Sequence, residues 1–390
     1  MSLKSRKEYL QIARQRYAKA KSRTEKSHLL DEVVQVLGYH RKYAVQILKG
    51  SSHALLRTVS KRTRPKLYLE ALPIIQLVWE ALDFPCAERL QPVLLETAEL
   101  LAAHGELLLT PLVREQLGQI SRATLARRLR SWTSPKPRRT FLRRPSPSVL
   151  EASIPIATYR WNEDRPGALA ADLVEHNGGQ SLGQFACTLT LLDVVTGYSR
   201  RRAVLGKGRA PILRELQRLI AQWPYSVWGL HSDNGPEFLN GHLLVFAQAN
   251  DLEFTRSRPY RKNDNPHAEQ KNLQYVRQIV GYARYDTPQQ VEWLNQVYAC
   301  LDRYANLFLP MRKLTAKERL GSRTRKAYDT AQSPVRRILR LVDLTPEQRH
   351  HLETQLATEN PLALHRQLEA LLLQVPNEAA SSNKATSLMA

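Results

Sequence analysis

Three carboxylates stand where a folded chain could present them together. Asp172 falls within an apolar run that favours a strand, Asp233 follows a second such run, and Glu269 falls in the first turns of an expected long helix. Strand ends and helix starts are where sheet-and-helix proteins expose functional groups. Carboxylates are hard oxygen ligands that favour Mg²⁺ or Mn²⁺ over zinc. Two such ions could activate an attacking oxygen and stabilise a leaving one during displacement at phosphorus.

Neighbouring residues support a site at these positions. His231 lies two residues before Asp233, so a strand places both on one face. Asn234-Gly235 forces a sharp turn directly after the aspartate. On the expected helix, Asn272 lies on the same side as Glu269. Position alone nevertheless leaves a metal site and ordinary turn and cap carboxylates equally open.

Other carboxylates compete with the three. Asp193 is the main competitor, because its strand could neighbour the strand of Asp172; we favour the interpretation that it is the turn residue of DVVTGY. Glu175 falls on the opposite face of the strand from Asp172. Glu237 begins a helix, where the dipole favours an acid.

The elements that must position these residues alternate between strands and helices. Consecutive strands are expected over residues 169–176, 184–193 and 198–205. They are followed by a helix over 210–222, a strand over 226–232, a helix over 236–250, a strand over 252–256 and a long helix from Pro266 to Tyr282. This order predicts an α/β core, residues 149–314, built as a mixed sheet with helices packed on it.

The first 132 residues are expected to be helical, with two helix-turn-helix-like segments. In the first, Gly38 separates a helix over 26–37 from one over 40–48. In the second, a helix capped by Thr110-Pro111 runs to about Leu117, Gly118 makes the turn, and Ser121 caps an arginine-rich helix. Residues 67–104 resemble longer packing helices. Helix pairs of this outline occur in DNA-binding domains, but also in other helical proteins.

Composition separates the remaining regions. Residues 133–148 hold four prolines, five basic residues and no acid, which indicates an extended linker. We expect residues 315–375 to be a helical C-terminal region, with helix starts at Thr345-Pro346 and after Asn360. The tail, residues 376–390, is expected to be disordered.

Charge points to a polyanionic partner. The formal net charge is +22, and residues 1–150 hold 28 Lys and Arg against 12 Asp and Glu, whereas residues 151–390 hold 30 against 24. Nucleic acid is the favoured partner; a merely basic protein and an anionic membrane surface are the alternatives. Three scattered cysteines, no signal peptide and no membrane-spanning run predict a soluble cytoplasmic protein that does not enter membranes.

Four segments resemble a known superfamily: ALAADLVEH, TLLDVVTGYSRRRAV, HSDNGPEFLN and RPYRKNDNPHAEQKN. They look like the core of retroviral-type integrases and bacterial insertion-sequence transposases. In that superfamily an Asp-Asp-Glu triad sits on a ribonuclease-H-like fold, with the second Asp in an Asp-Asn-Gly-x-Glu-Phe segment and the Glu on a later helix. Here 35 residues separate Asp233 and Glu269, and the resemblance spans roughly residues 165–285.

The resemblance implies a function. Asp172, Asp233 and Glu269 become the ligands of two Mg²⁺ or Mn²⁺ ions, and the basic N-terminal region recognises the terminal repeats of a mobile element. The reaction is DNA strand cleavage at the element ends and transfer of the 3′-hydroxyl into target DNA, by a transposase in the bacterial cytosol. Because two ends are joined, we expect a homo-oligomer on DNA. Zinc-binding His and Cys pairs of the retroviral type are missing from the sequence, which favours the insertion-sequence branch.

One further departure and two alternatives qualify this expectation. Residues three and seven past Glu269 are Asn272 and Val276, so the basic pattern of retroviral members on this helix is not reproduced. An inactive DNA-binding regulator and a structure-selective nuclease on the same fold are the alternatives. The residues expected to contact DNA are all basic: Arg122, Arg127, Arg128, Arg130, Arg138, Arg139, Arg258, Arg261, Lys271 and Arg277.

Overall fold

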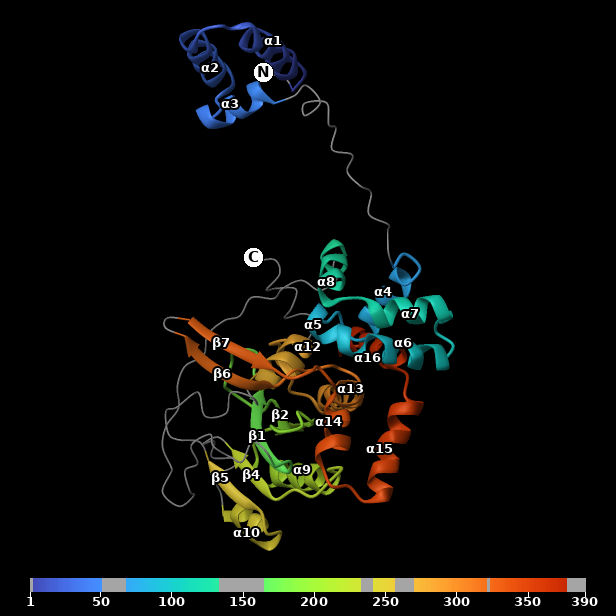
Figure 1. Cartoon of the computed structure of the whole chain (residues 1–390). Helices are drawn as coiled ribbons and strands as arrows, with labels where there is room; N and C mark the ends of the chain where they lie inside the picture. The colour runs from blue at the N-terminus through green and yellow to red at the C-terminus, as the bar shows by residue number, and fades with distance from the viewer. Residues whose placement is uncertain are drawn as a thin grey trace. The chain divides into compact units, whose positions relative to one another are not determined.

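The computed structural model describes residues 3–50, 68–132, 165–232, 241–256, 270–320 and 323–376 (Figure 1). Contacts divide the chain into two compact units, Met1–Leu67 and Tyr68–Ala390. Each unit has its own hydrophobic core.

The smaller unit holds three helices, α1 (Leu3–Lys19), α2 (Arg23–Leu37) and α3 (Arg41–Lys49). Ser22 and Glu25 form a capping box at the start of α2, and Gly38 ends it with a φ of 68°, a left-handed conformation that glycine adopts without strain. Apolar residues at helical spacing on all three helices form the core. They include Leu10, Ala13, Tyr17, Leu29, Leu30, Val33, Leu37, Ala44 and Leu48. The two helices expected on either side of Gly38 are confirmed.

The larger unit is built on a five-stranded mixed sheet. Its strands are β1 (Ala168–Glu175), β2 (Ala186–Asp193), β3 (Ser199–Leu205), β4 (Gly229–Ser232) and β5 (Glu253–Arg256), in the order β3-β2-β1-β4-β5. β1, β2 and β3 pair antiparallel, whereas β1, β4 and β5 pair parallel. The parallel pairs need crossovers, in which the helices α9 (Arg209–Ala221) and α10 (Gly241–Ala249) lie. The expected α/β class is confirmed.

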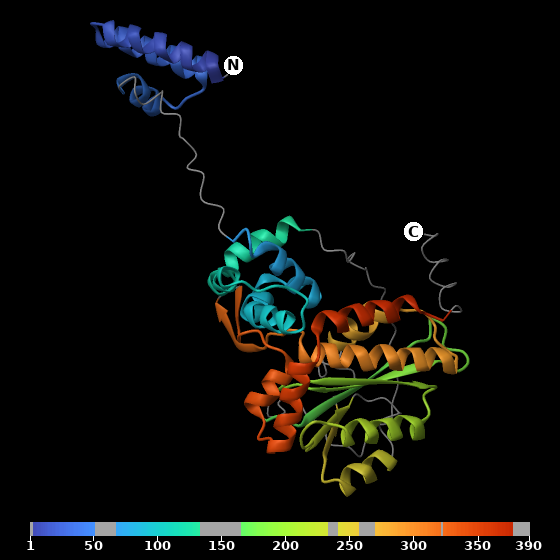
Figure 2. The same cartoon turned by 90° about the vertical axis from the view of Figure 1, so that its right-hand side faces the viewer.

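Helices pack on both faces of this sheet (Figure 2). The yellow-green α9 lies against one face and buries Ile212, Leu216 and Leu219. The orange helix α13 (Pro288–Leu307) lies on the other side, where the Tyr298 hydroxyl accepts a hydrogen bond of 3.0 Å from Thr188. The sheet therefore has two distinct faces, and every strand residue can be assigned to one of them by its register.

α13 also covers the edge strand β3. Asn295 and Asn306 each exchange two hydrogen bonds with the backbone of β3, at Ala203 and Ser199 respectively. Asp302 accepts a 2.7 Å hydrogen bond from the Arg201 backbone between them. Side chains thereby satisfy the backbone groups that an edge strand would otherwise expose.

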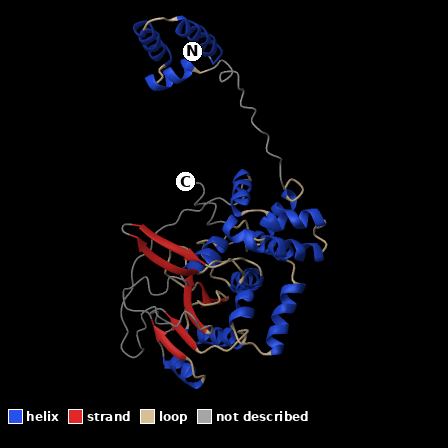
Figure 3. Ribbon diagram, in the orientation of Figure 1, coloured by secondary structure: helices blue, strands red, loops and turns tan. Residues whose placement is uncertain are grey.

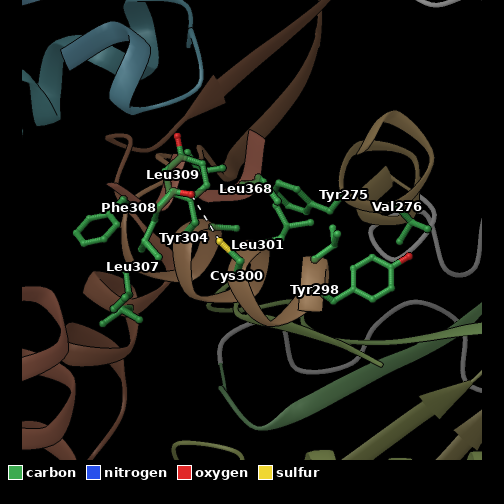
Figure 4. Close-up of a cluster of buried hydrophobic side chains, with 14 of the residues drawn as sticks. Tyr275, Val276, Tyr298, Cys300, Leu301, Tyr304, Leu307, Phe308, Leu309 and Leu368 are labelled. Carbon is green, nitrogen blue, oxygen red and sulfur yellow. Dashed lines mark hydrogen bonds between the residues drawn. The ribbon is translucent and has the colours of Figure 1, made fainter. Parts of the chain in front are cut away.

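α13 is the longest helix among the described residues, and no helix was expected there from the sequence. Its start carries a capping box of Thr287 and Gln290 with a proline at the first position. Figure 4 shows how its aromatic and aliphatic side chains, among them Tyr298, Leu301 and Tyr304, form a continuous buried cluster. Burial of this many apolar groups makes α13 the centre of the larger unit.

Short helices before the central sheet pack against α13 and the C-terminal helices. They are α4 (Leu72–Ala81), α5 (Ala87–Leu90), η2 (Gln91–Val93), α6 (Leu94–Ala103), α7 (Pro111–Gln119) and α8 (Arg122–Ser131). Tyr304 on α13 donates a 2.8 Å hydrogen bond to the Ala81 carbonyl. These helices bury their apolar faces in the core of the larger unit.

This grouping differs from the sequence-based one, which joined residues 68–132 to the N-terminal helices. The apolar faces of α4 and α6 need a partner surface, and the larger unit supplies it. Thr110 and Ser121 cap α7 and α8 as expected. Gly118 was expected to make the turn, but α7 continues through it to Gln119. The turn instead falls at Ile120, whose side chain is buried.

The C-terminal region differs from the all-helical expectation. Two strands, β6 (Leu314–Leu320) and β7 (Arg323–Tyr328), pair antiparallel there and are coloured red in Figure 3 with the five strands of the central sheet. Helices α14 (Pro334–Leu341), α15 (Pro346–Thr358) and α16 (Pro361–Leu373) follow. Thr345 and Asn360 cap α15 and α16, which confirms both expected helix starts.

Several expectations lie outside the described residues. The proline-rich linker at 133–148 and the tail from residue 377 are among them. Among the residues that are described, no helix combines the length and apolar character needed to cross a membrane.

Candidate active site

Asp172 lies on the face of the sheet that α13 covers. It pairs with Thr190 of β2, which in turn pairs with Arg201 of β3, so these three residues form a row across the antiparallel strands. On the parallel side, Ala171 pairs with Ser232, the last residue of β4. The side chain of Asp172 is half-buried. Asp172 follows Ala171, so it lies one residue past the last described pair between β1 and β4.

Asn272 contacts Asp172 from an element one hundred residues later. Its Nδ2 donates to Asp172 Oδ2 over 2.6 Å, while Asp172 Oδ1 accepts the Leu173 backbone N–H at 2.9 Å. Asn272 is only 5% exposed, and its Oδ1 is a buried acceptor with no hydrogen-bond partner among the described residues. A buried amide oxygen of this kind normally has a partner. A second oxygen acceptor therefore lies beside the carboxylate.

Asn272 precedes a π-helical turn. Residues 270–272 are helical, η3 (Leu273–Arg277) is a π-helix, and α12 (Gln278–Val280) ends the segment. The sequence predicted an unbroken helix to Tyr282, but the segment ends at Gly281, whose φ is 78°. The wider turn buries both Tyr275 and Val276. Such π-turns are frequent at functional sites.

A buried basic cluster supports this helix from behind. Arg201 forms a buried ion pair with Asp302 of α13, and its guanidinium lies 4.7 Å from the centre of the Tyr275 ring. The Lys271 ammonium lies 4.6 Å from the same ring and 4.0 Å from Met311 Sδ. Burial, and then the charge of Arg201, lower the pKa of Lys271 to about 7. The ring of Tyr275 thus links β3, α13 and the helix that carries Asn272.

Asp193 belongs to a turn and not to this site. It pairs with Leu169, three residues before Asp172, and so lies on the opposite face of the sheet. Its carboxylate accepts hydrogen bonds from the backbone of Gly167 (2.8 Å), Val195 (2.6 Å) and Thr196 (3.0 Å) and from the Tyr225 hydroxyl (2.7 Å). Burial raises its pKa, and these hydrogen bonds oppose the rise. The interpretation as a turn residue is confirmed.

The other neighbours have structural contacts. His231 is buried, and its Nδ1 lies 2.9 Å from Thr255 Oγ1 on β5, so it ties the ends of two parallel strands together. Glu175 lies on the face opposite Asp172, as expected, and pairs with Lys207. Glu237 lies outside the described residues.

The structure describes only part of the residue set selected from the sequence. Asp233 and Glu269 lie outside the described residues, as do Arg138, Arg139, Arg258 and Arg261. On α8, Arg122, Arg127 and Arg130 are exposed and Arg128 is half-buried. Arg277 donates a 2.8 Å hydrogen bond to the Glu175 carbonyl and stacks on Tyr282.

The oxygen atoms around Asp172 fit a hard divalent cation. A carboxylate has about four lone-pair sites on two oxygens, and the Asn272 amide oxygen beside it is a further neutral donor. Oxygen donors of this kind suit Mg²⁺ or Mn²⁺ and do not suit a thiolate-preferring metal. Among the described residues no cluster of three His, Cys, Asp or Glu converges, so Asp172 alone does not complete a metal site.

Comparison with solved structures gives partial matches. The chain resembles the catalytic core of the HTLV-2 integrase, solved with magnesium in a dimeric form, with 12% identity and a TM-score of 0.29 over 37% of this chain and 90% of that one. It resembles the BIV integrase catalytic core with 17% identity and a TM-score of 0.23, over 27% of this chain and 64% of that one.

Comparison of sequences gives a match over most of the chain. No protein-family model matches. The uncharacterized protein y4rM of Sinorhizobium fredii is 33% identical over 340 residues, which is 86% of this chain and 96% of that protein. Because the identity extends over nearly the whole of that relative, the chain belongs to the same family as y4rM.

Proposed function

We propose that this chain is a transposase: a metal-dependent polynucleotidyl transferase with a ribonuclease-H-like core whose ligands are Asp172, Asp233 and Glu269. The observation that carries the proposal is the register between β1 and β4. Ala171 and Ser232 are paired in a parallel ladder, and each immediately precedes one of the two aspartates.

Chain geometry limits where the second aspartate can be. A trans peptide keeps consecutive Cα atoms about 3.8 Å apart, so the Cα of Asp233 must lie within that distance of the Cα of the paired Ser232. Neighbouring strands are about 4.8 Å apart, and residues in register on parallel strands share a face. If the ladder continues by one residue, the carboxylates of Asp172 and Asp233 share a face within reach of one ion.

The contact of Asn272 supports the third ligand. Glu269 precedes Asn272 by three residues, which is close to one helical turn. Asn272 already contacts Asp172, so a helix that includes Glu269 would bring its carboxylate toward the same end of β1. Three carboxylates from two strands and one helix would then converge, at the spacing expected from the sequence.

The described residues have definable roles in such a reaction. A pair of Mg²⁺ or Mn²⁺ ions would supply the activation of the attacking oxygen and the stabilisation of the leaving oxygen. Asp172 would hold metal, while Asn272 orients its Oδ2 through the 2.6 Å hydrogen bond. The Arg201–Asp302 pair and Tyr275 would fix the helix that carries Asn272. The first step is cleavage at an element end, and the second is attack of the freed 3′-hydroxyl on target DNA.

DNA recognition is assigned to basic surfaces. The smaller unit, residues 1–67, holds 17 Lys and Arg against 4 Asp and Glu, and α2 and α3 form the helix pair expected of a DNA-binding module. On the larger unit, α8 presents Arg122, Arg127 and Arg130 to solvent. We propose that the smaller unit recognises the element ends and that α8 contributes phosphate contacts.

Strand transfer tests the proposal. Purified protein is mixed with labelled DNA from the ends of the element, a plasmid target and Mg²⁺ or Mn²⁺, alongside Asp233→Asn and Glu269→Gln. Joined product from the wild type alone is expected. Nicking without joining would favour a nuclease, and binding without nicking would favour a regulator.

Two further outcomes would contradict parts of the proposal. If DNA joining survives both Asp233→Asn and Glu269→Gln, these two residues are not the metal ligands. Two DNA ends must be held together for joining, so we expect a homo-oligomer on DNA. Gel filtration that shows a monomer with end DNA bound would contradict this.

A further inference from the structure

The strands β6 and β7 form a two-stranded ribbon at the periphery of the larger unit (Figures 1 and 2). Every ribbon residue from 314 to 319 and from 324 to 328 is exposed. An isolated two-stranded ribbon gains little stability in water, because neither face buries a core. A ribbon with both faces exposed therefore calls for an explanation other than packing.

The register gives the ribbon one cationic face. Lys317 pairs directly with Lys326, and Arg319 pairs with Thr324, so these four residues share one face. No acidic residue of the described ribbon lies on that face. Like charges placed directly opposite each other on neighbouring strands are destabilising. The free protein therefore carries an electrostatic cost that a polyanion would remove.

The opposite face is different. There Glu318 pairs with Arg325, a cross-strand pair of opposite charge, while Ala316 pairs with Ala327 and Leu320 with Arg323, so this face carries one acid against two cations. A general excess of basic residues would leave cations on both faces without acids between them. The asymmetry shows that positive charge is concentrated on the side of Lys317 and Lys326.

The base of the ribbon is fixed to the body. Lys313 donates from its backbone to Asp329 Oδ1 at 2.7 Å and from Nζ to the carbonyl of Val195, in the turn after β2, at 2.7 Å. Arg337, which is 1% exposed, pairs with Asp329 and donates to the Met311 carbonyl at 2.9 Å. The ribbon is thus held in a defined position relative to the sheet that carries Asp172.

Met311 connects this base to the candidate active site. Its Sδ lies 4.0 Å from the Nζ of Lys271, which immediately precedes Asn272. Met311 also pairs with Gln332 by two backbone hydrogen bonds, which close the base of the ribbon. A ligand on the ribbon and a substrate at Asp172 would therefore contact one connected body.

We propose that the cationic face of the β6–β7 ribbon binds the phosphate backbone of duplex DNA. Seven residues at about 3.3 Å each span roughly 23 Å, and a two-stranded ribbon fits the major groove of B-DNA. The inference rests on the proposed function, because it names a second surface that holds the DNA on which the active site acts.

The test compares charge-matched variants of the full-length protein. Lys317→Gln/Lys326→Gln removes the facing pair, while Arg209→Gln/Arg214→Gln removes two exposed cations from α9. Affinity for a fluorescent 30-base-pair duplex, a probe length of about 100 Å, is measured by anisotropy across a salt series. We expect the ribbon variant to bind roughly 10- to 100-fold more weakly at 0.1 M salt and its log–log salt slope to fall by about 1.8. The α9 variant should match the wild type.

Measurements of melting temperature and of strand transfer distinguish failure of the ribbon proposal from failure of the transposase proposal. The melting temperature of the ribbon variant should not be lower than that of the wild type, because the substitution removes a like-charge pair. Wild-type affinity and slope in a folded ribbon variant would overturn the ribbon proposal, even if the wild type joins DNA ends. If the wild type joins no DNA ends but the ribbon variant binds the duplex more weakly than the wild type, the transposase proposal is overturned and the ribbon proposal stands. If the ribbon variant loses binding to phosphatidylserine vesicles but keeps wild-type affinity for the duplex, duplex DNA is not the partner of the ribbon.

Discussion

Asp172 and Asp193 lie on neighbouring strands of one sheet, in different surroundings. Asp193 has four hydrogen-bond donors, all from its own turn and the segments beside it. Asp172 receives a donor from Asn272, one hundred residues away, whose own Oδ1 is buried without a partner among the described residues. A carboxylate whose hydrogen bonds all come from its own turn and its neighbours maintains the fold. A carboxylate bonded to a distant amide whose own oxygen has no described partner indicates a functional site.

Opposite faces of the sheet account for the difference. Asp193 pairs with Leu169, on the side of α9, and Asp172 lies on the side of α13. On its side Asp193 is buried together with Val195 and Tyr225, and a buried acid must be fully hydrogen-bonded. On the other face, the π-turn after Asn272 allows a helix to approach the strand end. The comparison predicts that substitutions at the two aspartates separate activity from stability.

The largest effect is expected at Asp172. Asp172→Asn removes a proposed metal ligand, and the loss of several kcal/mol of transition-state stabilisation corresponds to a strand-transfer rate on the order of 10³-fold lower. The melting temperature should stay near that of the wild type, because the one oxygen of the half-buried amide can still accept from Asn272 and only the local hydrogen bond from the Leu173 N–H is lost. Strand-transfer kinetics and thermal unfolding measure the two quantities. Wild-type activity in the folded variant would remove Asp172 from the site.

Asp193→Asn should show the reverse pattern. The amide replaces an acceptor oxygen by a donor that faces backbone N–H groups, so buried donors lose their partner. We expect the free energy of unfolding to fall by roughly 2–4 kcal/mol. The activity of the fraction that remains folded should be that of the wild type. Denaturant unfolding and activity per folded molecule test this, and an active-site role would be indicated by lost activity at unchanged stability.

The sequence predicted the parts of the fold whose pattern is local. Alternating apolar residues and turn glycines gave the three antiparallel strands within one or two residues, and Thr345 and Asn360 marked helix starts. The pair of strands β6 and β7 was missed because Ala, Lys, Glu, Arg and Leu favour helix. Cross-strand pairing decided the outcome there, and no local pattern shows it.

The candidate site was predictable in residue type but not in its supporting contacts. The motif around Asp233 and the spacing to Glu269 came from the sequence alone. The hydrogen bond between Asn272 and Asp172 and the buried Arg201–Asp302 pair join positions about one hundred residues apart. Such contacts depend on how the helices pack on the sheet, so no spacing rule reveals them.

Asn272→Ala should have an intermediate effect. Partners that orient a metal ligand typically contribute about 10- to 100-fold to metal affinity or activity. We expect the strand-transfer rate to fall by roughly this factor and the Mg²⁺ concentration for half-maximal rate to rise. Gln278→Ala, at an exposed position on the same segment, is the matched control. A rate that falls without any change in Mg²⁺ dependence would assign Asn272 to the fold rather than to the metal site.

The smallest effect concerns His176, which follows Asp172 by four residues and lies on the same face of the sheet. Its Nε2 lies 2.8 Å from Thr188 Oγ1, and burial, with the charge of Arg277, lowers its pKa to about 3. The unfolded chain takes up a proton near pH 6.5 and the folded protein does not, so stability contributed above pH 6.5 is lost as the pH falls toward 3.

Between pH 7.5 and 5.5 the loss attributable to His176 should be about 1.4 kcal/mol. His176→Gln removes this titration, so its free energy of unfolding should fall less than that of the wild type over the same interval. Denaturant unfolding at both pH values measures the difference, in which groups common to both proteins cancel. Parallel pH profiles for the two proteins would mean that the folded state also protonates His176. The face of the sheet that carries Asp172 would then be more open to water than the buried packing of His176 implies.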